Sequence, residues 1–210
     1  MFTNLRDIHS ISFTFRYPQK NQILIYDKLK SEFFKKYFKN YTVYSNRFYK
    51  STLVYLPFLL KCILRLNFSF SNYKKYFIEY VDPKIIITLN ENQLGFFETK
   101  KLFQKKIFIA IQGNWKFDVD HDIIFFRKKY KKKKLKCDYF FCYNDRVIQY
   151  YKKFIDCKNY IKIGSFDSNI FPIRKKTEKG LITFISQFKL KKDNDIWHKN
   201  HKFSDWRMNE

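Results

Sequence analysis

The stretch IFIAIQGNW, residues 107–115, places five apolar residues directly before the polar trio Gln112-Gly113-Asn114. Short apolar runs bounded by turn residues are typical of strands that are buried inside a sheet. Glycine and asparagine end such a strand because both adopt the backbone angles that turns need. Two interpretations follow for the polar trio: a simple turn, or a cradle for a ligand at the end of a sheet.

Similar apolar runs recur along the chain, with helix-like patterns between them. The strand-like runs lie at residues 23–27, 42–45, 84–89, 107–111, 138–143 and 161–164. Helical spacing of apolar residues recurs at 28–38, at 53–66, before Asp82-Pro83, at 93–103 and around 147–155, where Asn144 or Asp145 can cap the helix. Strands of continuous apolar residues that alternate with helices predict a parallel sheet covered on both faces. We therefore expect an α/β, Rossmann-like domain, with FTFRY at 13–17 as an edge strand.

A change of composition near residue 171 predicts the end of this domain. The stretch FPIRKKTEKG, residues 171–180, contains a proline and a glycine and has no apolar period, so it is typical of a linker. A new strand, LITFISQF, begins at residue 181 and a polar tail follows it. We expect a domain at 1–170, a linker at 171–180 and the start of an incomplete second domain at 181–210.

The charge of the chain favours an anionic partner. Forty-three Lys and Arg against nineteen Asp and Glu give a formal net charge of +24, which suits nucleic acid or an anionic membrane. The densest cluster, RKKYKKKKLK at 127–136, is either a solvated loop or a segment attracted to anionic lipid headgroups. No nucleic-acid recognition module is visible, so we do not expect a nucleic-acid partner.

The cysteines and the apolar stretches bear on the compartment. The four cysteines form no CxxC pair, and reduced thiols in a cytosolic protein are the simplest account. Cys137 and Cys142 are an odd number of residues apart, so we expect them on opposite faces of one strand. The apolar stretch 53–68 contains Lys61 and Arg65 and is too short to span a membrane. Its helix is either part of the core or lies on a membrane surface.

Each strand in the series ends in small or amide side chains. In open α/β sheets, ligands bind outside the carboxyl ends of the strands, so these residues predict a polar cleft. Few of them are charged, which suits a neutral, hydroxyl-rich ligand such as a sugar, or a phosphate near glycine. Neither GxGxxG nor a P-loop is present. The residues are Asn90, Glu91, Asn92, Gln112, Gly113, Asn114, Asn144, Asp145, Gly164, Ser165, Ser186 and Gln187.

Five segments together resemble a known family. The bacterial surface-carbohydrate biosynthesis proteins, glycosyltransferases of the GT-B type in lipopolysaccharide and capsule synthesis, are similar over about residues 20–188. The segments are EYVDPKIIITLNENQLGFF (79–97), IFIAIQGNW, CDYFFCYND (137–145), IKIGSFDSN (161–169) and LITFISQF. The residues that match the family's motifs are Thr88, Asn92, Gln112, Gly164, Ser165, Asn169, Ser186 and Gln187. Glu91 stands where the family has Asp, and Gly113-Asn114 is in reversed order.

This resemblance implies transfer of a sugar from a nucleotide-sugar donor to a glycan or lipid-linked acceptor. The reaction would take place in the cytoplasm, at the inner face of the membrane, with the donor as co-substrate and no further cofactor. Glu91 is the candidate base for the acceptor hydroxyl, with Asp118 and His121 behind it. Because the second domain usually holds the donor, we expect a truncated chain that needs a longer product or a separately encoded second domain. The alternative is a non-catalytic basic protein that binds an anionic membrane surface or a protein partner.

Two further motifs could bind a metal ion, but we do not predict a metal site at either. Asp118, Asp120 and Asp122 form a DxD-like alternation that could bind a divalent cation, but a solvated loop between lysines is the other interpretation. His198 and His201 have a spacing that zinc tolerates, although no cysteine is close.

Overall fold

The computed structural model describes residues 11–28, 31–44, 52–113 and 135–166. All of these residues belong to one compact unit, Met1–Pro172. The predicted linker at 171–180 and the predicted second domain at 181–210 lie outside the described residues, so the division of the chain into domains stays a prediction.

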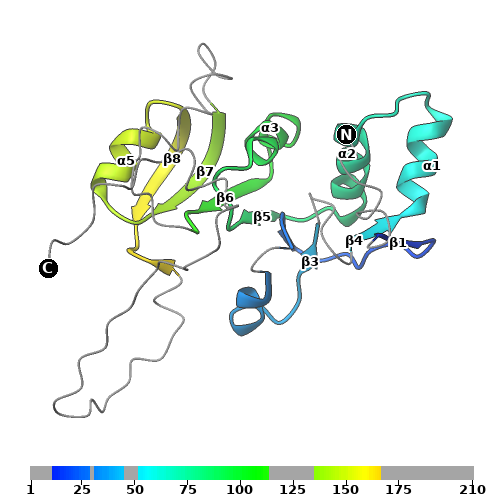
Figure 1. The fold of residues 1–210 in the computed structure, drawn as a ribbon, viewed down its shortest axis with the longest axis horizontal. Helices are drawn as coiled ribbons and strands as arrows, with labels where there is room; N and C mark the ends of the chain where they lie inside the picture. The colour runs from blue at the N-terminus through cyan, green and yellow to red at the C-terminus, as the bar shows by residue number, and fades with distance from the viewer. Residues whose placement is uncertain (1–10, 29–30, 45–51, 114–134, 167–210) are drawn as a thin grey trace, which may run out of the picture. The chain divides into compact units, whose positions relative to one another are not determined.

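A parallel sheet, six-stranded within the described residues, forms the centre of the fold (Figure 1). Its strands in spatial order are β3 (Thr42–Val43), β2 (Ile23–Ile25), β5 (Ile85–Thr88), β6 (Ile107–Ile111), β7 (Leu135–Cys142) and β8 (Ile155–Lys162). All adjacent pairs run parallel. Within this sheet, β2 comes first along the chain and β3 pairs on one side of it. The remaining strands then add in order on the other side of β2. This order is that of a doubly wound, flavodoxin-like α/β fold, and it confirms the predicted Rossmann-like class.

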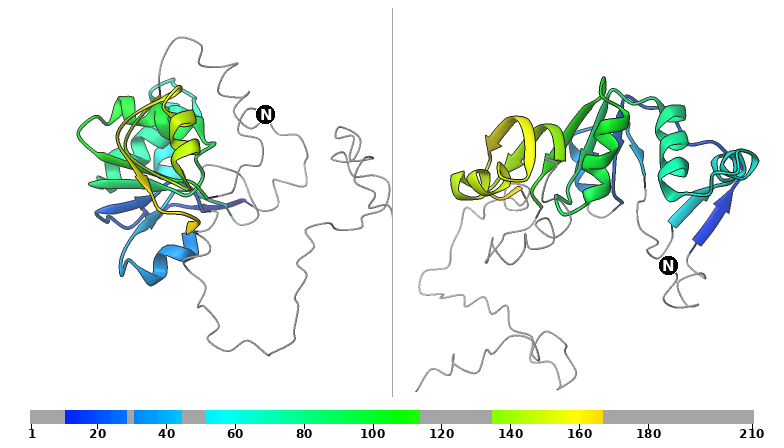
Figure 2. Two further views of the ribbon diagram at one scale, coloured as in Figure 1. Left: turned by 90° about the vertical axis from the view of Figure 1, so that its left-hand side faces the viewer. Right: turned by 90° about the horizontal axis from the view of Figure 1, so that it is seen from above.

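Helices cover both faces of this sheet, as Figure 1 and the turned views of Figure 2 show. The helices α2 (Phe70–Val81), α3 (Leu94–Leu102) and α5 (Asp145–Tyr151) pack on one face. The short 3-10 helix η2 (Ser31–Lys36) packs Phe34 against Ile25 and Ile87 on the other. Right-handed crossovers require this arrangement, because the direction of the chain across the sheet reverses at β2.

The first part of the predicted helix at 53–66 is a strand. Residues Thr52–Tyr55 form β4, which pairs in parallel with β1 (Ile11–Thr14) in a separate two-stranded sheet. Helix α1 therefore begins at Leu56 and ends at Leu64, with Pro57 in its first turn as predicted. The strand is favoured because β1 supplies the backbone pairing, and because the hydroxyl of Tyr73 accepts the backbone N–H of Tyr55 at 2.9 Å.

Two other boundaries differ from those predicted. The pattern at 28–38 yields only the six-residue η2, a 3-10 helix of about two turns that connects two neighbouring strands. Helix α5 ends at Tyr151, and β8 begins at Ile155 rather than at 161. The segment IDCKNY looks unlike a buried strand because β8 is an edge strand, with one side and several polar side chains exposed. The predicted end of α2 at Asp82-Pro83 is confirmed.

The predicted opposite orientation of Cys137 and Cys142 is wrong. Both thiols are buried in the core cluster beneath α2, α3 and α5, because the alternation of β7 shifts by one residue between Cys137 and Phe140. Asp138 lies at this shift. Its carboxylate accepts the backbone N–H of Phe108 in the neighbouring strand at 2.8 Å and pairs with Lys100 Nζ of α3 at 2.6 Å.

This buried ion pair predicts a stability effect. We expect Asp138→Asn to lower the free energy of unfolding by about 3 kcal/mol in urea titrations at pH 7, because it leaves a buried lysine without its counter-charge. Asp145→Asn is the matched control, since its pair with Lys162 is solvent-exposed and should contribute less than about 1 kcal/mol. Equal losses for the two variants would contradict the interpretation.

The pH dependence of this effect follows from the same contacts. Burial opposes ionisation of Asp138, but the bonds from Lys100 and from the Phe108 N–H outweigh it and lower the pKa of the carboxyl. A depressed folded-state pKa gives stability that is present above the unfolded-state pKa and is lost as the pH falls. The difference in the free energy of unfolding between wild type and Asp138→Asn should therefore become smaller below about pH 4.

Candidate functional site

The carboxyl ends of the parallel strands lie along one edge of the sheet and carry most of the predicted site residues. This edge includes the point between β2 and β5 where the chain reverses its direction across the sheet. Open α/β sheets bind ligands outside such a switch point. We call the residues that follow β2, β5 and β6 there, Asp27, Asn90–Gln93 and Gln112-Gly113, the strand-end site.

The ends of β2 and β5 are joined directly. The side-chain amide of Gln93 donates a hydrogen bond to the carboxylate of Asp27, and both side chains are buried. The sequence analysis missed both residues. Asp27 could have been predicted by the rule used for the other strand ends, because it is the polar residue at the end of the apolar run ILIYD.

The ends of β5, β6 and β7 are joined by Glu91, Gln112 and Gly113. Glu91 is 1% exposed, and its Oε2 accepts the backbone N–H of Gly113 at 3.1 Å. The side-chain carbonyl of Gln112 accepts the backbone N–H of Tyr143 at 3.1 Å. The backbone N–H of Gln112 donates to the carbonyl of Phe141 at 2.9 Å. Gln112 and Gly113 therefore tie three neighbouring strand ends together.

The loop after β5 presents the amides nearest to solvent. The buried Thr88 hydroxyl accepts the backbone N–H of Asn90 at 3.1 Å, and the Asn90 side chain accepts that of Asn92 at 3.3 Å. Asn90 and Asn92 themselves are partly exposed. A ligand at the switch point would meet these two side chains, while Glu91 between them points inward.

The predicted residues after β7 and β8 have local roles. Asn144 caps α5 by accepting the N–H of Val147 at 3.0 Å, which confirms the predicted helix start. Gly164 has φ +71°, a left-handed conformation that favours glycine at this turn. Ser165 beside it is partly buried.

The remaining predicted residues lie outside the described residues. They are Asn114, Asp118, Asp120, His121, Asp122, Asn169, Ser186, Gln187, His198, His201 and the lysines of the basic cluster up to residue 134. Within the described ranges, no group of three or more His, Cys, Asp or Glu side chains is placed to hold a metal ion. In the same ranges, no helix has both the length and the apolar character that crossing a membrane requires.

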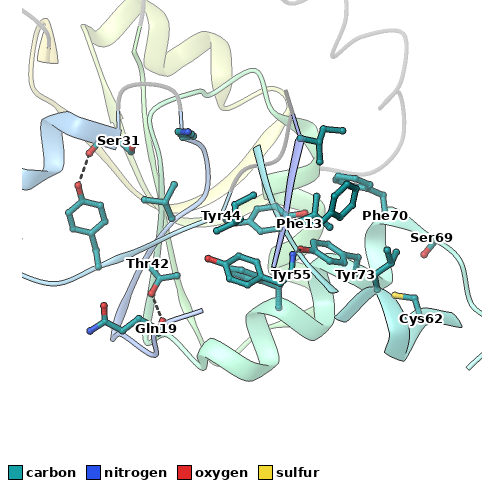
Figure 3. A pocket seen from close by; sticks show the side chains of 18 of the residues that line it. Phe13, Gln19, Ser31, Thr42, Tyr44, Tyr55, Cys62, Ser69, Phe70 and Tyr73 are labelled. Atoms are coloured by element: carbon teal, nitrogen blue, oxygen red, sulfur yellow. Dashed lines mark hydrogen bonds between the residues drawn. The ribbon is translucent and has the colours of Figure 1, made fainter. Parts of the chain in front are cut away.

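A pocket of about 610 Å³ lies beside the edge strand β3 and includes none of the predicted site residues (Figure 3). Residues of β1, β3, β4, α1 and α2 line it, among them Phe13, Thr42, Tyr44, Tyr55, Leu59 and Phe77. We call it the β3-edge pocket. No sequence pattern predicts it, because its walls come from β1, η2, β3, β4, α1 and α2, which only the fold brings together.

The fold and the strand-end site together define an α/β unit of the Rossmann-like kind with a polar switch point. Residues 109–206 of the chain match a family described as putative O-antigen biosynthesis protein. This match, which begins inside β6, supports a role in surface carbohydrate biosynthesis. No curated protein and no solved structure matches the chain.

The bond between Glu91 and Gly113 predicts a measurable change in local stability. We expect Glu91→Ala to cost about 1–3 kcal/mol, because it leaves a buried N–H unpaired. Hydrogen exchange by NMR should show the Gly113 amide exchanging at least about tenfold faster. Glu79→Ala on the exposed face of α2, where Glu79 pairs loosely with Lys75 at 3.8 Å, is the control. Unchanged exchange at Gly113 would show that Glu91 does not hold this turn.

Proposed function

We propose that the chain forms the acceptor-side domain of a GT-B-type glycosyltransferase of surface polysaccharide or lipopolysaccharide biosynthesis. The whole enzyme would transfer a sugar from a nucleotide-sugar donor to a glycan or lipid-linked acceptor. The observation that carries this proposal is the strand-end site: a polar, internally bonded set of residues at the switch point of a parallel sheet. The match of residues 109–206 to an O-antigen biosynthesis family supports the same process.

The side chains of the strand-end site suit a sugar better than an anion. Asn90 and Asn92 carry partly exposed side-chain amides, the chemistry that recognises hydroxyl groups. The Asp27–Gln93 and Glu91–Gly113 bonds fix the loop that carries them. A rigid loop reduces the conformational entropy that ligand binding would otherwise cost.

The predicted chemistry needs a base for the acceptor hydroxyl. Glu91 was our candidate, but its burial and its bond to Gly113 favour a positioning role over direct contact with an acceptor. In this proposal Asp118 or His121 becomes the better candidate base. The nucleotide-sugar donor is the co-substrate, and a second domain, on the same chain or encoded separately, binds it.

Acceptor binding provides the test of this proposal. The probe is oligosaccharide released from the surface polysaccharide of the bacterium that encodes the chain, observed by saturation-transfer NMR. We expect wild type to show transfer, and Asn90→Ala/Asn92→Ala to weaken binding at least about tenfold, as the loss of two hydrogen-bonding side chains predicts. Asn159→Ala, which removes an exposed amide from β8, is the control.

Two results would contradict the proposal. One is the absence of a saturation-transfer signal with wild type at millimolar oligosaccharide. The other is an equal saturation-transfer signal with wild type and with Asn90→Ala/Asn92→Ala.

A second candidate function, contact with an anionic membrane, rests on a separate observation. Helix α1 buries Phe58 and Cys62 in the core, and its other residues remain at least partly exposed. Large apolar side chains stand exposed along α1 and the connection to α2, with Leu64 83% and Leu66 87% exposed. We call this surface the α1 patch; its apolar residues are Leu60, Ile63, Leu64, Leu66, Phe68 and Phe70.

Cations accompany the α1 patch. Lys61 and Arg65 lie between its apolar residues, and both lie over the ring of Tyr76, at 4.4 Å and 5.6 Å from its centre. Apolar side chains that enter the acyl boundary beside cations that meet phosphates are the features of an interfacial helix. Such peripheral contact at the inner face of the cytoplasmic membrane is compatible with a lipid-linked acceptor, and by itself it would constitute the non-catalytic alternative.

Vesicle binding tests the α1 patch. We expect the chain to sediment with vesicles of phosphatidylcholine and phosphatidylglycerol more strongly than with phosphatidylcholine alone. Leu64→Glu/Leu66→Glu should weaken this binding at least about tenfold, because insertion then buries charge. Leu102→Glu, at an exposed leucine of α3 outside the α1 patch, is the control. If both variants bind like wild type and moderate salt abolishes binding, net charge alone is responsible and the α1 patch is not the contact.

A further inference from the structure

The β3-edge pocket has the size of a small-molecule site. Its volume of about 610 Å³ lies within the range of roughly 300–1,000 Å³ that is usual for ligand pockets. Figure 3 shows that its side chains converge from β1 and β4, from β3, and from α1 and α2. It shares no residue with the strand-end site, so an inference from it does not depend on the proposed function.

Most polar side chains in the wall of the pocket already have partners within the protein. The Thr42 hydroxyl donates to the carbonyl of Gln19 at 2.6 Å, and the Tyr41 hydroxyl donates to that of Ser31 at 3.2 Å. Asn21 donates to the Thr42 hydroxyl at 3.0 Å, Ser69 caps α2 at 3.1 Å, and the Tyr55 N–H bonds the Tyr73 hydroxyl. What the wall offers to a ligand is therefore mainly aromatic and aliphatic surface.

Tyr44 is the exception. Its side chain is only 2% exposed, and its hydroxyl has no hydrogen-bond partner among the described residues. The side chain points in among the other lining residues (Figure 3). Burial raises the pKa of this phenol well above its ordinary value, so the group remains a neutral hydroxyl at physiological pH. A buried hydroxyl without a partner is unfavourable, and a hydrogen-bonding group on a ligand would relieve that cost.

The mouth of the pocket is partly apolar, although Gln19, Lys28, Glu32 and Ser69 of the lining are exposed as well. Four lining residues, Phe13, Leu53, Phe68 and Phe70, are at the same time exposed to solvent. Two of them, Phe68 and Phe70, belong to the α1 patch. A ligand that enters here exchanges water for ring and alkyl surface, which is favourable only when the ligand is itself largely apolar.

We propose that the β3-edge pocket binds an uncharged, largely apolar molecule whose single hydroxyl or carbonyl group pairs with the Tyr44 hydroxyl. The charged side chains of the lining, Lys28 and Glu32, have opposite signs and Glu32 pairs with Lys35, so the wall has no net charge that would favour an ion. Flat aromatic alcohols and alkyl alcohols share this chemistry, and the experiment distinguishes them.

Three probes test the proposal on the full chain. 2-Naphthol, followed by its own fluorescence, is compared with naphthalene, which lacks only the hydroxyl; 1-decanol serves as the alkyl competitor. We expect saturable binding of 2-naphthol with a dissociation constant on the order of 100 µM or tighter. Naphthalene should bind about three- to tenfold more weakly, the usual effect of one buried hydrogen bond.

Variants connect this binding to the pocket. Tyr44→Phe should remove the preference for 2-naphthol over naphthalene while leaving naphthalene binding unchanged. Tyr37→Phe, the same change at an exposed tyrosine of the turn after η2, should leave the preference intact. Leu59→Trp, which fills the pocket, should abolish binding of both probes, with circular dichroism and thermal melting showing that the variant is folded.

The outcomes separate clearly. Displacement of 2-naphthol by 1-decanol assigns the site to alkyl as well as aromatic alcohols, and lack of displacement restricts it to aromatic ones; both support the pocket. Absence of saturable 2-naphthol binding would overturn the proposal. So would an unchanged preference in Tyr44→Phe, or unchanged binding in a folded Leu59→Trp variant.

Discussion

Strand β2 pairs with β3 on one side and with β5 on the other, and the rest of the described structure depends on this double pairing. Because the chain visits β3 before β5, it must cross back over β2, which reverses its direction across the sheet. Right-handed crossovers then require η2 on one face and α2, α3 and α5 on the other. The same reversal leaves a point at which the loops after β2 and β5 diverge, and there the polar strand ends gather.

Buried polar contacts hold this arrangement in one register. The Asp27–Gln93 and Glu91–Gly113 bonds join strand ends, and Asp138 replaces a backbone acceptor where β7 loses its alternation. A further contact crosses the layer of helices: Lys74 Nζ of α2 lies 3.0 Å from the Tyr26 hydroxyl and 3.2 Å from the carbonyl of Gly95. Burial lowers the pKa of Lys74, which shows how strongly this environment disfavours an unpaired charge. Such groups specify one packing because any alternative would leave them unsatisfied.

The pairing that creates the switch point also makes β3 an edge strand. An edge presents unpaired backbone groups, and proteins usually cover it. Here the elements that line the space beside β3 are β1, β4, α1 and α2, whose bulky aromatic side chains leave the β3-edge pocket between them. The polar strand ends and the largely apolar pocket are thus two consequences of one strand order, and they differ in the chemistry of their side chains.

The sequence by itself determined the class of fold and part of the strand-end site. Continuous apolar strands alternating with helices predict a parallel sheet because each strand is buried on both faces. This pattern is local, so it can be recognised without knowing which elements pack together. The amides after residues 88 and 111 were predictable for the same reason, and applying the rule to the run 23–27 would have added Asp27. Tertiary structure alone decided the rest. The pairing of β1 with β4, the early start of the edge strand β8 and the shared face of Cys137 and Cys142 depend on partners distant in sequence. The buried, unpaired hydroxyl of Tyr44 likewise depends on elements far apart in the sequence that pack around it, and no periodicity along the chain predicts which elements meet.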